Sequence, residues 1–348
     1  MKVCFFGIYD STYSRNRVLM DGFRAHGYEV FECKVDPKQF GKFGKFYALL
    51  REYKKIKHLS FDYVIVAFPG HSMVWLARIL FGKGVIFDAF VSLYNSIIED
   101  RKNYKKYNPK ALYYWFIDWF SCALASKVLL DTNTHINYFV KTFHLSRKKF
   151  IKVFVGTTTD IFYPQKIKKD TEEFTIHFHG SFIPLQGIEY IIRAAKLLED
   201  KKDTHFRIIG NGPEYKKMQL LAKKLNIHNV EWIPRISLNE LAEYINRADI
   251  VLGIFGSTSK TELVIPNKVY EAIACGKPVI TAKTLAMQEM FVDGEHVLFV
   301  EKANPNDLAK KIIGLKNNTE LQKYISDNSY KLFTQELSPD SIVRNILL

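Results

Sequence analysis

Short apolar runs alternate with helically spaced segments along residues 1–156, and this alternation predicts the local structure. The predicted strands are Val3–Phe6, Glu29–Cys33, Tyr63–Ala67, Gly84–Phe87, Val128–Leu130 and Ile151–Val153. The predicted helices are Arg17–His26, Met73–Phe81, Pro109–Ala125 and Thr134–Phe143. Continuous Val, Ile and Phe runs separated by helices are typical of parallel strands buried on both faces. Residues 1–156 therefore predict one doubly wound α/β domain.

The alternation stops at residues 157–170, where Thr residues, Pro164 and several Lys predict a linker, and a second series follows over 171–335. Its predicted strands are Phe174–His179, His205–Ile209, Val230–Ile233, Ile250–Ile254 and Pro278–Thr281. Its predicted helices are Gly187–Leu198, Glu214–Leu225, Leu238–Arg247, Lys268–Ala274, Leu308–Leu315 and Thr319–Glu336. We expect residues 336–348 to form a tail that packs back on the first domain. The predicted fold class is α/β, with two doubly wound Rossmann-like domains facing an interdomain cleft, and ligands in such sheets bind beyond the carboxyl ends of the strands.

One segment, Ala111–Leu130, resembles a membrane span in length and apolar content. Asp118 and Lys127 lie inside it, and a charge at mid-bilayer costs about 2.5–3.5 kcal/mol on insertion scales. We predict instead a soluble helix that ends near Ala125, followed by a buried strand, Lys127–Asp131. The N-terminus lacks the pattern of a signal peptide, and the four Cys form no C-x-x-C pair, so we expect buried reduced thiols and a cytoplasmic protein.

The amino-acid composition excludes several classes of protein. The 348 residues are 47% apolar and 25% charged, which excludes a disordered chain, a collagen and a small disulfide scaffold. Lys and Arg number 50 and Asp and Glu 36, so the formal net charge is +14. A basic balance of this size favours an anionic partner, which could be nucleic acid, a phosphorylated ligand or a lipid surface.

Two glycine-containing loops directly follow predicted strands and precede predicted helices. The first is His179–Gly187, and the second is Gly210–Pro213. Glycines let backbone N–H groups approach a ligand, and a helix N-terminus attracts phosphate. A simple tight turn explains the first loop equally well, and the second lacks the G-x-G-x-x-G spacing of a dinucleotide site. The candidate substrate-binding residues here are Gly180, Ser181, Gln186, Gly187, Gly210, Asn211 and Gly212.

The most specific motif is the segment Pro266–Ile280, which predicts a short buried helix that Pro266 and Asn267 open. Lys268 and Glu271 lie three residues apart in its first turn, on one face. A buried cation and carboxylate are costly unless they are paired. Lys268 could meet a diphosphate and Glu271 a ribose, while a mutual Lys–Glu pair is the alternative. The candidates of this segment are Pro266, Asn267, Lys268, Val269 and Glu271.

At these residues the sequence resembles the family 4 glycosyltransferases of the GT-B fold. In that family a G-x-F/L-x-x-x-[KQH]-G loop, a G-x-G-P turn and a P-x-K-x-x-E-A-x-A-x-G-K-P-V-I helix surround a nucleotide diphosphate sugar. They correspond here to Gly180–Gly187, Gly210–Pro213 and Pro266–Ile280, and Val155–Pro164 is similar to the family's segment between the domains. The resemblance implies that residues 171–335 bind the nucleotide sugar and residues 1–156 the acceptor.

The chain departs from the family pattern at three positions. Where many members have an Arg and a Lys that reach phosphate oxygens, this chain has Ser181 and Gln186. Where many have a Glu eight residues before the helix Glu, it has Leu263, with Glu262 beside it. Lys268 is therefore expected to carry more of the diphosphate charge, and Glu262 is a candidate to replace the missing Glu.

In the N-terminal half, three residues are candidates because they follow predicted strands. These are Gly7, His71 and Asp88. The resemblance implies that a polar residue near Asp88 contacts the transferred sugar, and His71 and Asp88 join Lys268 as the catalytic candidates. A capping His71 and an Asp88 that starts a turn are the structural alternatives, and for His71 we favour the structural one.

The resemblance also implies retention of anomeric configuration, the nucleotide sugar as co-substrate, and no metal or other cofactor. Basic and aromatic residues interleave over Phe40–Tyr47 and Arg101–Lys110, and the aromatic helix residues Tyr113–Phe120 follow. Such stretches can lie on an anionic membrane, which favours peripheral association with the inner membrane face. A solvated basic face over a buried aromatic helix is an equal alternative.

The sequence thus predicts a glycosyltransferase with a glycan or lipid-linked acceptor, in cell-envelope polysaccharide or glycolipid synthesis. Another GT-B activity, such as a nucleotide-sugar epimerase, and a noncatalytic glycan- or nucleic-acid-binding protein are the alternatives. No RNP, zinc-finger or helix-turn-helix pattern points to nucleic acid, so we expect none as a partner.

Overall fold

The computed structural model describes residues 1–36, 44–168 and 172–347. Two predictions fall partly outside these residues. They are the first part of the basic and aromatic stretch, Phe40–Phe43, and the end of the predicted linker, Lys169 and Asp170. Within the described residues the chain divides into two units, Met1–Gly156 with Ser338–Leu348, and Thr157–Leu337.

The first unit contains one parallel sheet of six strands within the described residues, in the order β2-β1-β3-β4-β5-β6. The strands are β1 (Lys2–Ile8), β2 (Glu29–Val35), β3 (Tyr63–Val66), β4 (Val85–Asp88), β5 (Lys127–Leu130) and β6 (Phe150–Lys152). The strand order reverses between β1 and β3, and the loops after these strands are where such a sheet binds ligands.

Its helices begin at residues that suit helix starts. Asn108 and Thr132 cap α4 and α5, accepting hydrogen bonds from Lys110 N (2.9 Å) and His135 N (3.0 Å). The helices are α1 (Ser14–Ala25), α2 (Gly44–Ile56), α3 (Val74–Phe81), α4 (Pro109–Leu124), α5 (Asn133–Phe143) and α12 (Pro339–Leu347). The predicted helix and strand of the Ala111–Leu130 segment are confirmed as α4 and β5. Along the described ranges, every helix is too short or too polar to cross a membrane.

The second unit repeats the architecture with a different strand order. Its strands, again six among the described residues, follow the order β12-β11-β10-β7-β8-β9. They are β7 (Phe174–His179), β8 (Thr204–Ile209), β9 (Val230–Ile233), β10 (Ile250–Leu252), β11 (Val279–Ala282) and β12 (Leu298–Val300). Counted from β7, this is the Rossmann order 3-2-1-4-5-6, whose ligand crevice lies between the first and fourth strands. The carboxyl ends of β7 and β10 therefore mark the candidate site.

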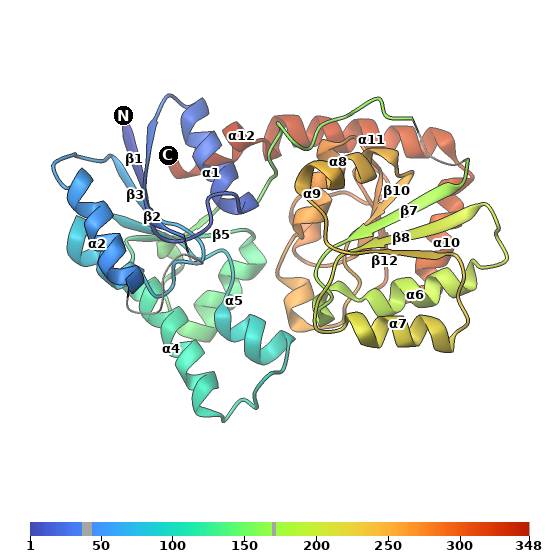
Figure 1. The fold of residues 1–348 in the computed structure, drawn as a ribbon, viewed down its shortest axis with the longest axis horizontal. Helices are drawn as coiled ribbons and strands as arrows, with labels where there is room; N and C mark the ends of the chain where they lie inside the picture. Colours follow the sequence, from blue (N-terminus) through green and yellow to red (C-terminus); the bar gives the residue numbers. More distant parts are fainter. Residues whose placement is uncertain (37–43, 169–171, 348) are drawn as a thin grey trace. The chain divides into compact units, whose positions relative to one another are not determined.

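Helices cover both faces of this second sheet, with α6 and α7 on one side and α8 and α9 on the other (Figure 1). The helices are α6 (Ile188–Leu197), α7 (Tyr215–Lys224), α8 (Leu238–Arg247), α9 (Asn267–Ala274), α10 (Pro305–Lys316) and α11 (Thr319–Leu332). The short 3-10 and π turns are η1 (Asn95–Asp100), η2 (Arg147–Lys149), η3 (Pro184–Gln186), η4 (Ser259–Glu262), η5 (Met287–Glu289) and η6 (Phe333–Leu337). The predicted fold class of two doubly wound α/β units is thus confirmed.

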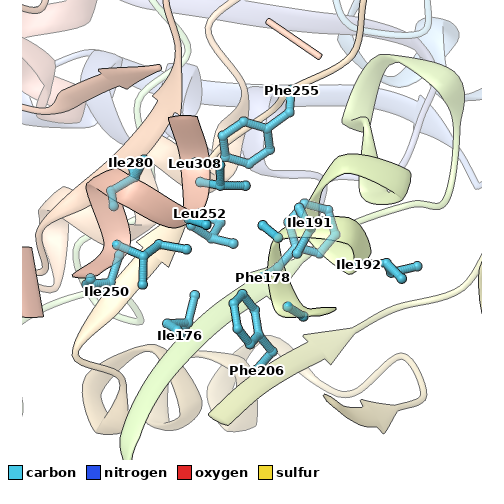
Figure 2. Packing of buried hydrophobic residues seen from close by; sticks show 14 of the residues in the cluster. Ile176, Phe178, Ile191, Ile192, Phe206, Ile250, Leu252, Phe255, Ile280 and Leu308 are labelled. Carbon is cyan, nitrogen blue, oxygen red and sulfur yellow. The ribbon is translucent and has the colours of Figure 1, made fainter. Parts of the chain in front are cut away.

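Each sheet has its own apolar core. In the second unit, Phe178 of β7 and Phe206 of β8 lie among the side chains of α6 and α10 (Figure 2). In the first unit, Phe6, Phe87 and Phe139 belong to the corresponding cluster. The four Cys are buried free thiols, and burial raises the pKa of the Cys33 and Cys275 thiols to about 12.

The linker segment and the C-terminal segment each belong to one of the two units. The described part of the predicted linker belongs to the second unit, where the Asn246 side chain donates to Tyr163 O (3.1 Å) and accepts from Gln165 N (2.8 Å). The last residues belong to the first unit, where α12 packs on α1 (Figure 1). A Cβ at Gly22 of α1 would overlap Pro339 O and Val343 Cγ2, so glycine is required for this close approach.

Candidate functional site

Two loops meet at the carboxyl ends of β7 and β8, and glycines make their approach possible. A Cβ at Gly210 would overlap Gly180 O, and a Cβ at Gly212 would lie 2.5 Å from Phe182 N. The expected role of the glycine amides as phosphate ligands needs correction. Gly180 N donates to Ile209 O (3.0 Å) and Gly212 N to the side chain of Asn211 (2.7 Å). These glycines allow the two loops to pack, and their amides are used within the chain.

Lys268 lies in the first turn of α9, with 4% of its surface exposed. Its Nζ donates to Gln186 Oε1 and lies 3.5 Å from the centroid of the Phe178 ring. A Cβ at Gly180 would lie 3.0 Å from Nζ, so the first loop is glycine where the ammonium approaches it. Burial holds the pKa of Lys268 well below its usual value, and the Glu271 carboxylate partly offsets this.

Glu271, one turn further along α9, is 6% exposed and accepts a hydrogen bond from His179 Nε2 at 2.6 Å. His179 Nδ1 in turn lies 2.9 Å from His177 Nε2. Lys268 and Glu271 therefore bind different partners, Gln186 and His179, on β7 and the loop after it. They do not form the mutual ion pair that was the alternative in the sequence analysis. Burial lowers the pKa of His177 well below its usual value, with His179, Arg207 and Lys268 acting in the same direction.

This arrangement can recognise an anion beside a hydroxyl-bearing group. The N-terminal turn of a helix has backbone N–H groups without helical acceptors and the positive end of the dipole. The first turn of α9 adds the ammonium of Lys268, and the carboxylate of Glu271 adds a strong acceptor for hydroxyl groups. All of these groups lie in the unit whose sheet order places a ligand crevice beside β7.

The other predicted residues of this unit lie nearby but have different surroundings. Ser181 and Asn211 are exposed, Pro266 is buried, and Asn267 is the half-buried first residue of α9. Gly187 adopts φ +65°, and a Cβ there would overlap Gly256 N. Val269 is fully buried and its amide donates to Pro266 O (3.0 Å), so we leave it out of the site.

The partners of Glu262 lie outside the first turn of α9. Its carboxylate pairs with Lys302 and accepts a hydrogen bond from Leu285 N at 3.0 Å. These contacts hold η4 against the loops that follow β11 and β12. Glu262 thus forms a structural ion pair, and its candidate role in place of the family's Glu stays a prediction.

Asp88 requires a similar correction in the first unit. It lies at the end of β4, but it is fully buried, and Arg15 binds both carboxylate oxygens at 2.9–3.1 Å. Arg15 also donates to Val153 O (2.9 Å) and Phe154 O (2.7 Å). Burial raises the pKa of Asp88, while Arg15 lowers it. Because this carboxylate is enclosed and both of its oxygens accept hydrogen bonds from Arg15, we leave Asp88 out of the proposed site.

His71 has the structural surroundings that we favoured. It is buried, its Nε2 donates to Val91 O (3.1 Å), and its ring packs edge-on against Phe87. Burial lowers the pKa of His71 to about 4, so the ring is neutral at pH 7. Asp118 lies 3.4 Å away, and burial raises the pKa of its carboxyl to about 7. The enclosed ring and its hydrogen bond to a backbone carbonyl fit the structural alternative for His71.

Gly7 lies inside β1, where it pairs with Lys34, and does not end the strand as we expected. The loops that follow β1 and β3 are joined by Asn16, whose side chain donates to Phe68 O (2.7 Å) and accepts from Phe68 N (3.1 Å). These loops mark the switch point of the first sheet, where an acceptor would bind if the unit follows the general rule for such sheets.

The sequence reasoning missed His177, Phe178 and His179 as members of the site. A signal was present, because two His at positions i and i+2 of an otherwise apolar strand point to the same face. In the sequence, His179 stands out only as the first residue of a glycine loop.

Comparison with solved structures identifies the fold. Across 100% of this chain and 98% of that one, the structure is similar to Anabaena HepE in complex with UDP and glucose, with a TM-score of 0.74 and 13% identity. It is also similar to sucrose-phosphate synthase of Thermosynechococcus elongatus, with a TM-score of 0.77 and 14% identity over 99% of this chain and 97% of that one. At these identities the likeness shows the fold, which is GT-B.

Comparison of the amino-acid sequence with family models identifies the family of the second unit. Residues 160–332 match the profile of the glycosyl transferases group 1, and this half of the chain belongs to that family. An uncharacterized glycosyltransferase of Methanocaldococcus jannaschii is 32% identical over 176 residues, which are 49% of this chain and 45% of that protein. The chain therefore spans about half the length of the curated relatives that it matches.

Proposed function

We propose that the protein is a glycosyltransferase that moves a sugar from a nucleotide diphosphate sugar to an acceptor. The observation that carries this proposal is the α9 turn, in which buried Lys268 and Glu271 lie beside the glycine loops of a group 1 glycosyl transferase unit. Lys268 binds the diphosphate and Glu271 the ribose. HepE binds UDP, which supports a nucleoside diphosphate as the leaving group here.

The proposed reaction retains the anomeric configuration. The bond from the sugar C1 to the phosphate oxygen breaks, and a bond from C1 to the acceptor oxygen forms on the same face. The acceptor proton passes to the leaving phosphate. Charge that develops on the leaving oxygens is stabilised by Lys268 and the N-terminus of α9, and this positive charge takes the role of a metal ion. Activity is expected to be unchanged in EDTA.

The proposed acceptor is a glycan or a lipid-linked glycan, in cell-envelope polysaccharide or glycolipid synthesis at the inner face of the membrane. Support comes from the exposed side chains around the start of α4. Tyr107 is completely exposed, Leu112 and Tyr113 are more than half exposed, and Lys105 and Lys106 flank them. Apolar and cationic side chains in one segment suit the surface of an anionic membrane. The proposed location is therefore cytoplasmic and peripheral to the membrane.

A thermal-shift screen tests the proposal. UDP, GDP, ADP and their sugar conjugates are each added to the full chain at millimolar concentration. We expect one nucleotide series to raise the melting temperature, because a ligand that binds only the folded state stabilises it. Stabilisation by none of them would overturn the proposal, and salt-dependent binding of RNA in its place would favour the noncatalytic alternative.

A further inference from the structure

Three buried side chains form a continuous chain beneath the α9 turn. Glu271 Oε2 lies 2.6 Å from His179 Nε2, and His179 Nδ1 lies 2.9 Å from His177 Nε2. His177 is fully buried, and its remaining nitrogen, Nδ1, has no partner among the described residues. The chain thus begins at an enclosed nitrogen and ends at the carboxylate of the proposed donor site.

The proton positions in this chain follow from its chemistry. A carboxylate only accepts hydrogen bonds, so His179 Nε2 carries a proton and donates to Glu271. When the His179 ring carries one proton, on Nε2, its Nδ1 atom is an acceptor and His177 Nε2 donates to it. Both hydrogen bonds point toward the carboxylate, and His177 fixes the tautomer of His179.

We propose that His179 is a positioning residue for Glu271 in donor binding. The imidazole holds Oε2 of the carboxylate, so that Oε1 remains for a hydroxyl of the donor. Among the described residues, the Glu271 carboxylate has one side-chain hydrogen-bond partner, His179, which lies 92 positions away in the chain. A carboxylate held in place before the ligand arrives loses less conformational freedom on binding, which increases affinity. This inference rests on the proposed function.

Two substitutions distinguish a positioning role of His179 from a role in packing alone. In His179→Gln, the side-chain nitrogen Nε2 can take the place of the ring Nε2 and still donate to Glu271. In His179→Asn, the amide reaches only as far as the ring Nδ1 and cannot reach the carboxylate. Both variants remove the ring and place a neutral amide in the same buried site. They differ by one methylene group, so a packing role predicts losses of affinity that differ by no more than about fourfold (about 0.8 kcal/mol) and that do not depend on Glu271.

The probe is the nucleoside diphosphate, of UDP, GDP and ADP, that most stabilises the unchanged protein. Titration calorimetry is expected to show about a 10-fold or greater loss of affinity in H179N, the usual effect of losing a hydrogen bond to a charged group. H179Q is expected to stay within about threefold of the unchanged protein, because the donor is kept. Equal affinities in H179N and the unchanged protein, or equal losses in both variants, would overturn the inference.

A double-mutant cycle tests that His179 acts through Glu271. In the Glu271→Gln background, H179N is expected to cause little further loss, because the carboxylate is already gone. Additive losses would contradict the proposal. If H179N does not fold, His177→Val takes its place, and about a threefold loss is expected because the tautomer of His179 is no longer fixed. Unchanged affinity in that variant would likewise overturn the inference.

The outcomes also separate this inference from the proposed function. If the unchanged protein binds none of the three nucleotides, the proposed function fails and the role of His179 fails with it. If the unchanged protein binds one of them and H179N binds it equally well, only the role of His179 is lost.

Discussion

At the scale of single residues, the central feature is a lysine that is buried before any ligand is present. Lys268 has a neutral hydrogen-bond acceptor, Gln186, and an aromatic ring, Phe178, as its nearest partners. Neither carries a full negative charge, so burial lowers the pKa of Lys268 despite Glu271 nearby. A diphosphate would supply the missing charge and raise that pKa again.

Binding of a nucleoside diphosphate should therefore be linked to uptake of protons. Affinity is expected to fall as the pH rises above the lowered pKa of free Lys268, because the ammonium must then be restored on binding. Calorimetry at about pH 8 in HEPES and in Tris checks this, since the two buffers release protons with different enthalpies. The control is Lys268→Met, which should remove the difference. An enthalpy that is the same in both buffers for the unchanged protein would contradict the linkage.

His71 gives a second prediction, for stability. Burial lowers the pKa of His71 from 6.5 to about 4, so between these values the unfolded chain binds a proton that the folded chain does not. Stability should therefore fall as the pH falls through this window, by about 2 kcal/mol between about pH 6.5 and pH 5. His71→Gln keeps a donor for Val91 O and should lose this dependence.

Urea unfolding of the unchanged protein and of His71→Gln, over this range of pH, measures the free energy of unfolding of each. Asp118 acts in the opposite direction, because burial raises its pKa to about 7, and this contribution is common to both proteins. If the pH dependence of unfolding is identical in the two proteins, His71 is not the neutral, buried group described above.

At the scale of elements, the C-terminal helix is a part of the first unit. Helix α12 packs on α1 at Gly22, where no side chain would fit. This contact joins the two ends of the chain across more than 300 positions, as the hydrogen bond between His26 Nε2 and Asp340 O (3.0 Å) also does.

Gly22→Ala tests this contact. The added methyl group should push α12 away from α1 and lower the free energy of unfolding by about 1–3 kcal/mol, as overpacking does. Gly314→Ala on α10 is a matched control, because a Cβ there meets no atom within 4 Å of those described. It should stabilise the protein by about 0.5–1 kcal/mol through helix propensity. Equal effects of the two substitutions in chemical unfolding would refute the close approach.

The elements also show what the sequence could predict. Continuous apolar runs predicted nearly every strand, because parallel strands are buried on both faces and need no knowledge of their neighbours. Helices α2 and α12 and strand β12 were missed, and α2 is rich in Lys and Tyr, which weakens its apolar pattern. The side-chain partners could not be predicted, because Lys268 binds Gln186, 82 positions away, and Asp88 binds Arg15, 73 positions away. Local spacing contains no such information.

At the scale of the whole molecule, a net charge of +14 gives the chain a general attraction to anionic surfaces. The proposed membrane contact is more specific, because it assigns binding to the segment around Lys105, Lys106 and Tyr107 at the start of α4. The same change in charge, made once in this segment and once at a distant surface, separates a specific contact from a general effect of charge.

Flotation with vesicles that contain anionic lipid makes this separation. Lys105→Glu/Lys106→Glu should weaken binding to the vesicles by at least about 30-fold, since each of the two lost cations contributes about 1 kcal/mol near such a surface. Lys310→Glu/Lys323→Glu changes the charge by the same amount at two exposed positions of α10 and α11, and should retain most of the binding. Equal losses in the two variants would show a general effect of charge, and no recovery of the unchanged protein at low salt would exclude the membrane contact.

The most direct test of the whole account is the affinity of Lys268→Met for the nucleoside diphosphate that stabilises the unchanged protein. Methionine keeps the volume of the side chain and removes the charge, so the fold should be retained. The account predicts that calorimetry finds affinity about 10- to 100-fold weaker in this variant, as expected for a lost charge-assisted hydrogen bond. Lys310→Met, on the exposed surface of α10, should stay within about twofold of the unchanged protein. An affinity for Lys268→Met equal to that of the unchanged protein would contradict the assignment of the donor site.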